Sequence, residues 1–249
     1  MKVTLVEFTG KGTVNPEWRA VDLLLFTKNT RLNMSPALLD DIRCWPEEKK
    51  IEELEYMANT IPSSWEFCHY TFLIEGVTRA FTHQSVRTRT NSFAQQTMRV
   101  LDVSEGRGWD YLAGPSIKAS EDLTAIYEQE MEDIARTYKS LIAKGAAIED
   151  ARGVLPTNIL TNIVVDTSLR TFVETVQKRS SPRTQGEYRD VLEAMKAEVK
   201  KVHPWIDIFL NRTASQAIED LQAMINAAIE DRDERTKATK LLDQLRIKL

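Results

Sequence analysis

Residues 82–99 read THQSVRTRTNSFAQQTMR, and this is the most informative stretch of the sequence. It holds three arginines, Arg87, Arg89 and Arg99, among hydroxyl and amide side chains, and it holds no acidic residue. Arginine presents a planar fork of donors that matches phosphate oxygens. Because unpaired arginines repel one another, the stretch predicts either an anion site or an exposed segment paired with distant acids.

A second polar cluster lies downstream, beginning with ARGVLPTN at residues 151–158. Arg170 and Glu174 stand four residues apart, so they share a face if the segment is helical. Arg179 and Arg183 flank a predicted helix start, and a helix N-terminus with arginines beside it favours anions. An ordinary polar junction between helices explains the same residues, and these residues alone leave both interpretations open.

Composition narrows the class of protein. The chain has 249 residues, 42% of them hydrophobic, with only 9 Gly and 8 Pro, which favours a helical globular fold over a loop-rich one. A net charge of −4 argues against a strongly basic nucleic-acid-binding protein. Cys44 and Cys68 lack metal-ligand and redox spacing, so we expect no metal site. The N-terminus lacks the features of a signal peptide and no apolar run is long enough to span a membrane, so we expect a cytoplasmic protein.

Hydrophobic periodicity and breakers predict the elements. Strands are predicted at 2–8, at 65–75 with Gly76 as its end, and at 97–103. Helices are predicted at 16–26, 35–43, 47–58, 77–89, 116–151 with a break near Gly145, 158–178 with Thr157 as its cap, and from 181 and 204 onward. The sequence therefore predicts an α+β fold in which a small mixed or antiparallel sheet is surrounded by many helices. Residues 1–249 form one domain in this prediction, with a mainly helical C-terminal half and a helical extension over about 211–249.

Five segments in chain order resemble the flavin-dependent thymidylate synthase family. The family signature is Arg-His-Arg, then Ser seven or eight residues later, then Arg-Tyr. The corresponding residues here are Arg87-Thr88-Arg89, Thr97 and Arg99-Val100. Residues 65–67 and 70–72 resemble the family's Phe-Glu-His and Phe-Thr-Phe. The other resemblances are residues 74–84 to the run into the motif helix, 151–156 to Ala-Arg-x-Val-Leu-Pro, and 179–187 to Leu-Arg-x-x-x-x-Ala-Gln-x-Glu.

The resemblance implies a fold, an assembly and a set of ligands. It implies a homotetramer with active sites between subunits, FAD as cofactor, and NADPH and 5,10-methylenetetrahydrofolate as co-substrates. The nucleotide, chiefly its phosphate, would be held by Gln84, Gln95, Thr97, Arg99, Arg152 and Arg179. Of these, Arg179 would lie against the pyrimidine ring and polarise it, as the catalytic residue. The flavin or its phosphates would be faced by Arg87, Thr88, Arg89, Ser168, Arg170, Glu174 and Arg183.

The chain departs from the family pattern at several of these positions. The central His of the signature is Thr88, the Ser is Thr97, and the Tyr is Val100. The Glu before the Ser is Gln95, and the His of Phe-Glu-His is Phe67. Downstream, an expected Asn is Glu174 and an expected His is Arg183. The arginines assigned to the nucleotide are retained.

Three functions remain open at this stage. The first is flavin- and folate-dependent one-carbon transfer to C5 of a pyrimidine deoxynucleotide, dUMP to dTMP, by a methyltransferase. The second is hydroxymethylation or methylation of dUMP or dCMP on the same fold, because a carboxylate such as Glu174 can accept from cytosine's exocyclic amine. The third is a non-catalytic nucleotide-binding homologue. The predicted partners are a pyrimidine deoxynucleotide monophosphate and folate, without a nucleic-acid polymer or a membrane.

Overall fold

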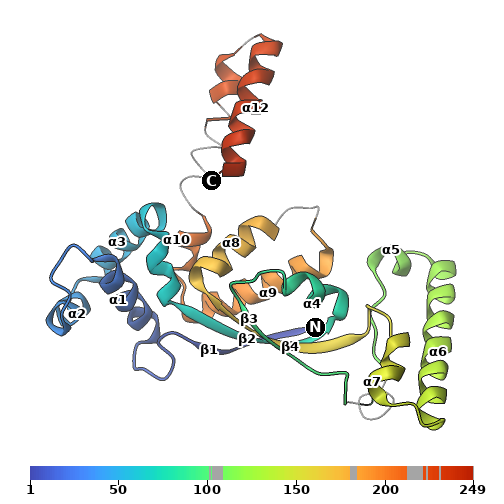
Figure 1. Cartoon of the computed structure of the whole chain (residues 1–249). Coiled ribbons are helices and arrows are strands. Elements are labelled where there is room, and N and C mark those ends of the chain that lie inside the picture. The colour runs from blue at the N-terminus through green and yellow to red at the C-terminus, as the bar shows by residue number, and fades with distance from the viewer. Residues whose placement is uncertain are drawn as a thin grey trace. The chain divides into compact units, whose positions relative to one another are not determined.

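The computed structural model describes residues 1–100, 102, 109–179, 184–211, 221–222, 224–229 and 231–248 (Figure 1). Contacts between Cα atoms divide the chain into two compact units. Unit 1 comprises residues 1–8, 70–167 and 178–198, and unit 2 comprises residues 9–69, 168–177 and 199–249. The single domain expected over residues 1–249 stays a prediction.

A four-stranded sheet lies almost wholly in unit 1, and the described residues give it the order β1-β2-β4-β3. The strands are β1 (Lys2–Phe8), β2 (His69–Thr78), β3 (Ser92–Gln95) and β4 (Leu160–Ser168). β1 pairs antiparallel with β2 and places Lys2 opposite Glu75, and β3 pairs antiparallel with β4 and places Ser92 opposite Asp166. The small antiparallel sheet and the many helices confirm the α+β class.

Alternating burial explains why β2 and β4 are strands. In β2 the side chains of Tyr70, Phe72 and Ile74 are buried, while the residues between them are half-buried. In β4 Ile163 and Val165 are buried with the same alternation. Side chains two positions apart in a strand point to the same face, so the sheet has one apolar face.

The helices of unit 1 begin with capping hydroxyls where the sequence offers them. They are α4 (Arg79–Ser85), α5 (Pro115–Lys118), α6 (Glu121–Ala143), α7 (Ile148–Ala151), the 3-10 turn η2 (Arg152–Val154) and most of α9 (Gly186–Val202). Thr78 Oγ1 accepts from the N–H of Phe81 at 3.0 Å and caps α4. The rings of Phe81 and Tyr188 meet edge to face at 5.1 Å, which packs α4 against α9.

Unit 2 is built of helices. They are α1 (Pro16–Lys28), α2 (Pro36–Arg43), α3 (Glu47–Thr60), the 3-10 helix η1 (Pro62–Phe67), most of α8 (Leu169–Arg179), α10 (Ile206–Leu210) and α12 (Arg232–Lys248). Trp65 of η1 and Phe209 of α10 are fully buried with ring centroids 4.9 Å apart. Leu24 and Leu54 complete a core between α1, α3 and these rings. α12 lies within residues 211–249, for which the sequence predicts a helical extension.

The largest error of sequence interpretation concerns residues 158–178. Thr157 does not cap a helix there, because the chain first forms β4 and turns into α8 only at Leu169. The run Ile163-Val164-Val165 is β-branched and flanked by alternating polar residues, which favours a strand. A helix-start pattern at Thr157 therefore precedes a segment that forms a strand, which is why the sequence alone predicts a helix there.

Other boundaries shift by smaller amounts. The strand predicted at 65–75 begins only at His69, because residues 62–67 form η1, and it continues through Gly76 at φ +67° to Thr78. The helix predicted at 77–89 is only α4, which ends at Ser85. The strand predicted at 97–103 is wrong, since β3 occupies residues 92–95 and residues 97–100 lie outside regular structure, while residues 101 and 103 lie outside the described part. The helix start expected at Ser181 also lies outside the described residues, and α9 begins at Gly186. Among the described residues, no helix is long and apolar enough to cross a membrane.

Candidate functional site

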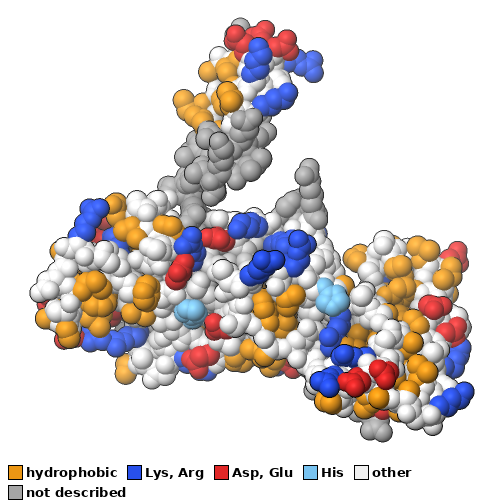
Figure 2. All heavy atoms as spheres, in the orientation of Figure 1, with side chains coloured by type: hydrophobic (Ala, Val, Ile, Leu, Met, Phe, Trp, Pro, Cys, Tyr) orange, Lys and Arg blue, Asp and Glu red, His pale blue; other side chains and the backbone are white. Residues whose placement is uncertain are grey.

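The acid-free stretch begins in α4 and ends beyond β3. Arg87 and Arg89 follow the last turn of α4, are exposed, and form no ion pair with any residue that the structure describes. Thr88 between them is half-buried. Figure 2 shows Lys and Arg side chains gathered in the region of α4 on the visible face. Two open guanidinium groups separated by one residue can bind an anion, which supports the first of the two interpretations of this stretch.

A cavity of about 260 Å³ in unit 1 is lined in part by two further arginines. Arg79, His83, Glu149 and Arg152 line it, together with Met98, Gly153, Leu155, Pro156, Thr157 and Ile159. Arg79 donates from Nη2 to the carbonyl of Gln96 at 2.9 Å, which ties the start of α4 to the end of β3. Arg152 donates from Nε to the carbonyl of Glu149 at 3.2 Å. The cavity is therefore a junction of α4, the β3 end and the α7–η2 turn.

The charged side chains around this cavity favour the binding of an anion. Arg99 donates from Nε to Glu149 Oε2 at 2.7 Å, so the carboxylate of Glu149 serves one of three nearby arginines. Burial lowers the pKa of Arg79 from its usual range, and the charge of Arg152 lowers it further. An anion placed beside Arg79 and Arg152 would offset the repulsion between the two guanidinium groups. Phosphate, with oxygens that match the guanidinium fork, is the group that fits best.

A chain of hydrogen bonds orients the amide of Gln84. Gln84 Nε2 donates to Gln185 Oε1 at 2.7 Å, and Gln185 Nε2 lies 3.4 Å from Glu187 Oε2. Glu187 also accepts from Thr78, through its backbone N–H at 2.7 Å and its hydroxyl at 2.5 Å. Because a carboxylate only accepts, it turns the NH₂ of Gln185 toward itself and leaves the Gln185 carbonyl for Gln84.

The remaining residues assigned to the nucleotide also lie in unit 1. Gln95 Nε2 donates to Thr82 Oγ1 at 3.0 Å, which fixes the β3 end against α4. Thr97 Oγ1 accepts from the N–H of Arg99 at 3.1 Å, so this hydroxyl shapes the loop that carries Arg99. Arg179, at the end of α8, lies over the ring of Tyr188 at 5.3 Å. This is a cation–π contact, which helps to hold the guanidinium in place.

The residues assigned to flavin are divided between the units. Arg87, Thr88 and Arg89 belong to unit 1, whereas Ser168, Arg170 and Glu174 belong to unit 2. Ser168 is buried, and its hydroxyl accepts from the N–H of Thr171 at 3.3 Å at the start of α8. Arg170 donates from Nε to Glu174 Oε1 at 3.1 Å, which confirms the shared helix face expected from their spacing. Arg183 lies outside the described residues.

Sequence interpretation assigned no role to four residues of this site. Arg79 and His83 line the cavity, Glu149 pairs with Arg99, and Glu187 directs the amide chain. Glu149 precedes Arg152 by three positions, which is a helix-face spacing that could have indicated it. Glu187 is the final Glu of the segment that resembles Leu-Arg-x-x-x-x-Ala-Gln-x-Glu, but its contact with Thr78, 109 residues away, could not be predicted from that pattern.

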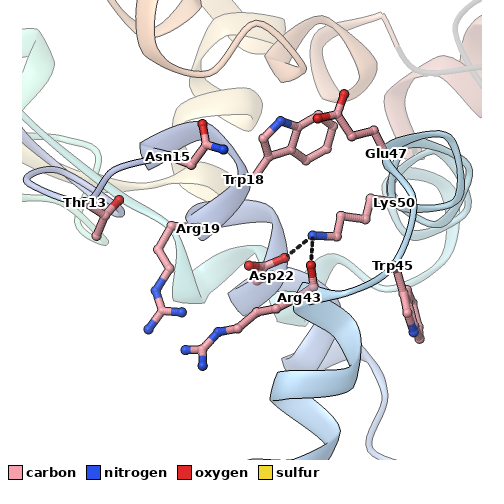
Figure 3. Close-up of a pocket in the computed structure, with 9 residues that line it drawn as sticks. All are labelled: Thr13, Asn15, Trp18, Arg19, Asp22, Arg43, Trp45, Glu47 and Lys50. Atoms are coloured by element: carbon pink, nitrogen blue, oxygen red, sulfur yellow. Dashed lines mark hydrogen bonds and ion pairs between the residues drawn. The ribbon is translucent and has the colours of Figure 1, made fainter.

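A separate cavity of about 290 Å³ lies in unit 2, and Figure 3 shows its lining. Lys50 of α3 reaches toward Asp22 of α1 and donates to Asp22 Oδ1 at 2.7 Å and to the carbonyl of Arg43 at 3.1 Å. Asp22 and Lys50 are only 6% and 4% exposed. Buried charges need an opposite charge and further hydrogen bonds. Lys50 has both, since Asp22 is its ion-pair partner and the carbonyl of Arg43, at the end of α2, accepts a further hydrogen bond. This cavity is thus explained by the packing of α1, α2 and α3.

The family model described as thymidylate synthase complementing protein matches residues 32–205. The flavin-dependent thymidylate synthase of Nitratidesulfovibrio vulgaris is 38% identical over 147 residues, which cover 56% of this chain and 59% of that protein. Proteins of the same name from Clostridium tetani and Geobacter sulfurreducens are 29% identical over 222 residues and 36% identical over 141 residues. The match to the Clostridium tetani protein covers 82% of this chain and 84% of that protein. The match to the Geobacter sulfurreducens protein covers 57% of this chain and 60% of that protein. The matched region is thus about three fifths of two of these relatives, and the chain belongs to the thymidylate synthase complementing protein family.

Proposed function

We propose that the protein is a flavin-dependent thymidylate synthase, which transfers a one-carbon unit to C5 of dUMP and forms dTMP. The single observation that carries the proposal is the cavity at Arg79 and Arg152, which Arg99 borders through its ion pair with Glu149. Its relatives are named for this activity. In the same proposal, 5,10-methylenetetrahydrofolate donates the carbon, NADPH is the reductant, and a cytoplasmic homotetramer is the active assembly.

The nucleotide-binding groups have distinct tasks in this proposal. Arg79, Arg99 and Arg152 bind the phosphate of dUMP, because three guanidinium groups with one carboxylate leave positive charge for it. Gln84, held by Gln185, presents its remaining amide atoms to the nucleotide. Arg179, which lies over the ring of Tyr188, polarises the pyrimidine ring. An arginine cannot act as a base, so its contribution is electrostatic stabilisation of charge that develops on the ring.

The residues beside α4 fit the cofactor. Arg87 and Arg89 are exposed and have no ion pair among the described residues, so they can bind the FAD diphosphate. Bound flavin would supply the hydride that reduces the transferred carbon to a methyl group. The protein contributes binding and orientation. Glu174, a candidate acceptor for a cytosine amine, forms an ion pair with Arg170.

Growth tests the proposal in a cell. The gene, expressed in a bacterium that lacks its own thymidylate synthase, is expected to restore growth without thymidine. The matched variant Arg152→Gln, at equal protein level, is expected to restore much less. Failure of the wild-type protein to restore growth, at a level where purified protein is well folded, would count against the proposed activity.

A further inference from the structure

Unit 1 also contains a cavity of about 880 Å³, which is larger than the cavity of about 260 Å³ at Arg79 and Arg152. The described linings of the two cavities have no residue in common. The apolar part of the larger lining includes Leu112, Ala113, Pro115 and Leu160. Small-molecule sites have volumes of this order and combine apolar walls with a few polar groups. The larger cavity is therefore a candidate for a second ligand site.

The two cavities lie on either side of two hydrogen-bonded segments of backbone. The N–H of Ala80 donates to the carbonyl of Thr157 at 2.8 Å, and the N–H of Arg79 donates to the carbonyl of Ile159 at 3.1 Å. Arg79 and Ile159 line the smaller cavity, whereas their neighbours Ala80 and Leu160 line the larger one. Successive side chains of an extended segment point to opposite sides, which explains the change of cavity from Ile159 to Leu160. A ligand in the larger cavity would thus be separate from the nucleotide.

Three polar side chains of this lining retain hydrogen-bonding capacity. Asp190 in α9 and Lys118 in α5 are exposed, and their side chains form no hydrogen bond or ion pair with the part of the chain that the structure describes. The hydroxyl oxygen of Tyr127 accepts from Asn158 Nδ2, which leaves its O–H to donate. Burial raises the pKa of Tyr127 against the opposing effect of that hydrogen bond, so the hydroxyl keeps its proton.

Glu187 and Gln185 line the same cavity but are already engaged. Both carboxylate oxygens of Glu187 accept from Thr78, and Oε2 also lies 3.4 Å from the amide nitrogen of Gln185. The side-chain carbonyl of Gln185 accepts from Gln84. Of the two described acidic residues in the lining, Asp190 is therefore the one whose oxygens are open to a ligand.

The open groups indicate the chemistry of the ligand. A carboxylate such as that of Asp190 binds two adjacent N–H donors in a bidentate manner, as it does with guanidinium. A 2-amino-4-oxopyrimidine ring presents that pair of donors in a neutral, planar form, and its other ring atoms can accept from Tyr127. The faces of the ring suit apolar walls. Lys118, a point charge on a flexible stem, suits an anionic group attached to the ring.

We propose that this cavity binds a heterocycle that combines a 2-amino-4-oxopyrimidine ring with an anionic substituent. Asp190 accepts from the amino edge, Tyr127 donates to the ring, and Lys118 pairs with the anion. Guanine nucleotides and pterins both carry this ring. The site is separate from the nucleotide cavity, and it does not depend on the proposed reaction.

Calorimetry with the full-length protein in excess FAD tests the site, with GMP and 6-carboxypterin as probes. At least one of them is expected to bind, and which of them binds identifies the ring system that the cavity accepts. AMP, which has the phosphate of GMP but not the paired donors, is expected to bind about ten- to a hundredfold more weakly than the probe that binds. Excess dUMP is expected to leave the affinity for that probe unchanged.

Variants assign the binding to this cavity. Asp190→Asn is expected to weaken the probe about ten- to a hundredfold, because an amide repeats one acceptor and turns a donor toward the ligand. Lys118→Gln is expected to weaken it about threefold, as for an exposed charge pair. The control is Glu193→Gln, which removes an exposed glutamate paired with Lys196 in the same helix as Asp190, and its affinity is expected to stay at the wild-type value.

Four results would overturn the inference. They are binding of neither probe, binding of AMP as tight as that of the probe, an unchanged affinity in Asp190→Asn, and displacement of the probe by dUMP, which would place it in the nucleotide cavity. None of these results measures dTMP formation, so failure of the second site and failure of the proposed function are distinguishable.

Discussion

Glu187, at the start of α9, accepts two hydrogen bonds from Thr78, one from the backbone N–H at 2.7 Å and one from the hydroxyl at 2.5 Å. Thr78 closes β2 and caps α4, the helix that leads into the arginine stretch. The same carboxylate lies 3.4 Å from the amide nitrogen of Gln185, and the side-chain carbonyl oxygen of Gln185 accepts from Gln84 Nε2. One acidic side chain therefore joins β2, α4 and α9 and sets the polarity of two amides at the proposed nucleotide site.

Replacement of Glu187 by Gln tests this role. A neutral amide offers Thr78 one acceptor instead of two, and it no longer forces the NH₂ of Gln185 toward itself. We expect the KM for dUMP to rise about tenfold, or about 1.4 kcal/mol, with a smaller change in kcat. Steady-state kinetics measure the split, and Glu193→Gln, on the same helix and exposed, is the control. If Glu187→Gln and Glu193→Gln changed KM and kcat to the same extent, the effect would come from helix stability and not from the hydrogen bonds of Glu187.

Arg152 is expected to contribute to dUMP binding through its charge. Arg152→Gln should raise the dissociation constant of dUMP by roughly ten- to a hundredfold, as expected for a lost charge-assisted hydrogen bond. The ratio of variant to wild type should shrink as salt is added, because screening weakens the contact in the wild type. Calorimetry at two salt concentrations measures both effects. Arg136→Gln, which removes an exposed arginine paired with Asp133 on α6, is the control and is expected to bind dUMP like wild type.

The buried pair of Asp22 and Lys50 predicts a non-additive stability effect. Lys50→Met leaves Asp22 buried without its cation and should lower the free energy of unfolding by about 3–5 kcal/mol. The double variant Asp22→Leu with Lys50→Met removes both charges and should recover most of that loss. Urea denaturation measures the cycle. Simple addition of the two single effects would mean that the charges do not interact.

His203 predicts a pH dependence of stability. It is fully buried, and burial lowers its pKa to about 4 from a usual 6.5, against the opposing effect of hydrogen bonds to the backbone of Pro16 and Thr9. In the unfolded chain the imidazole takes up its proton near pH 6.5, while in the folded chain it does so only near pH 4. Its contribution to stability is therefore complete above pH 6.5 and is lost as the pH falls toward 4, by about 3 kcal/mol in total.

The difference between wild type and His203→Gln isolates this titration from that of the carboxylates. The two proteins should show different slopes of unfolding free energy against pH between 6.5 and 4, with the steeper loss in the wild type. Identical slopes over that window would mean that His203 titrates alike in the folded and unfolded chain.

The accuracy of sequence interpretation followed the range of the interactions involved. Helices α2 and α3 were placed nearly to the residue, because Pro36 and Pro46 mark their starts and Ser35 caps the first. The Arg170–Glu174 pair was also accessible, since four residues of helix bring the side chains together. β4 was missed because its identity depends on pairing with β2 and β3, and the segment that precedes it contains a plausible helix cap.

The site itself was visible only as a set of residue types. The sequence offers the arginines of residues 82–99 and Arg152 as candidate anion ligands, but the cavity that Arg152 shares with Arg79 depends on the α7–η2 turn. Gln84 and Gln185 are 101 residues apart, and Arg170 and Glu66 are 104 apart, so no periodicity connects them. Tertiary structure decides which charges are open and which are paired, and this distinguishes Arg87 and Arg89 from Arg170.

The proposed reaction is tested most directly by the mass of the product that purified protein forms from dUMP in the presence of FAD, NADPH and 5,10-methylenetetrahydrofolate, with dCMP in a parallel reaction. We expect dTMP from dUMP and no conversion of dCMP, with product formation strongly reduced in Arg152→Gln. A product one oxygen heavier than dTMP, conversion of dCMP instead of dUMP, or no product despite bound flavin would contradict the proposed reaction.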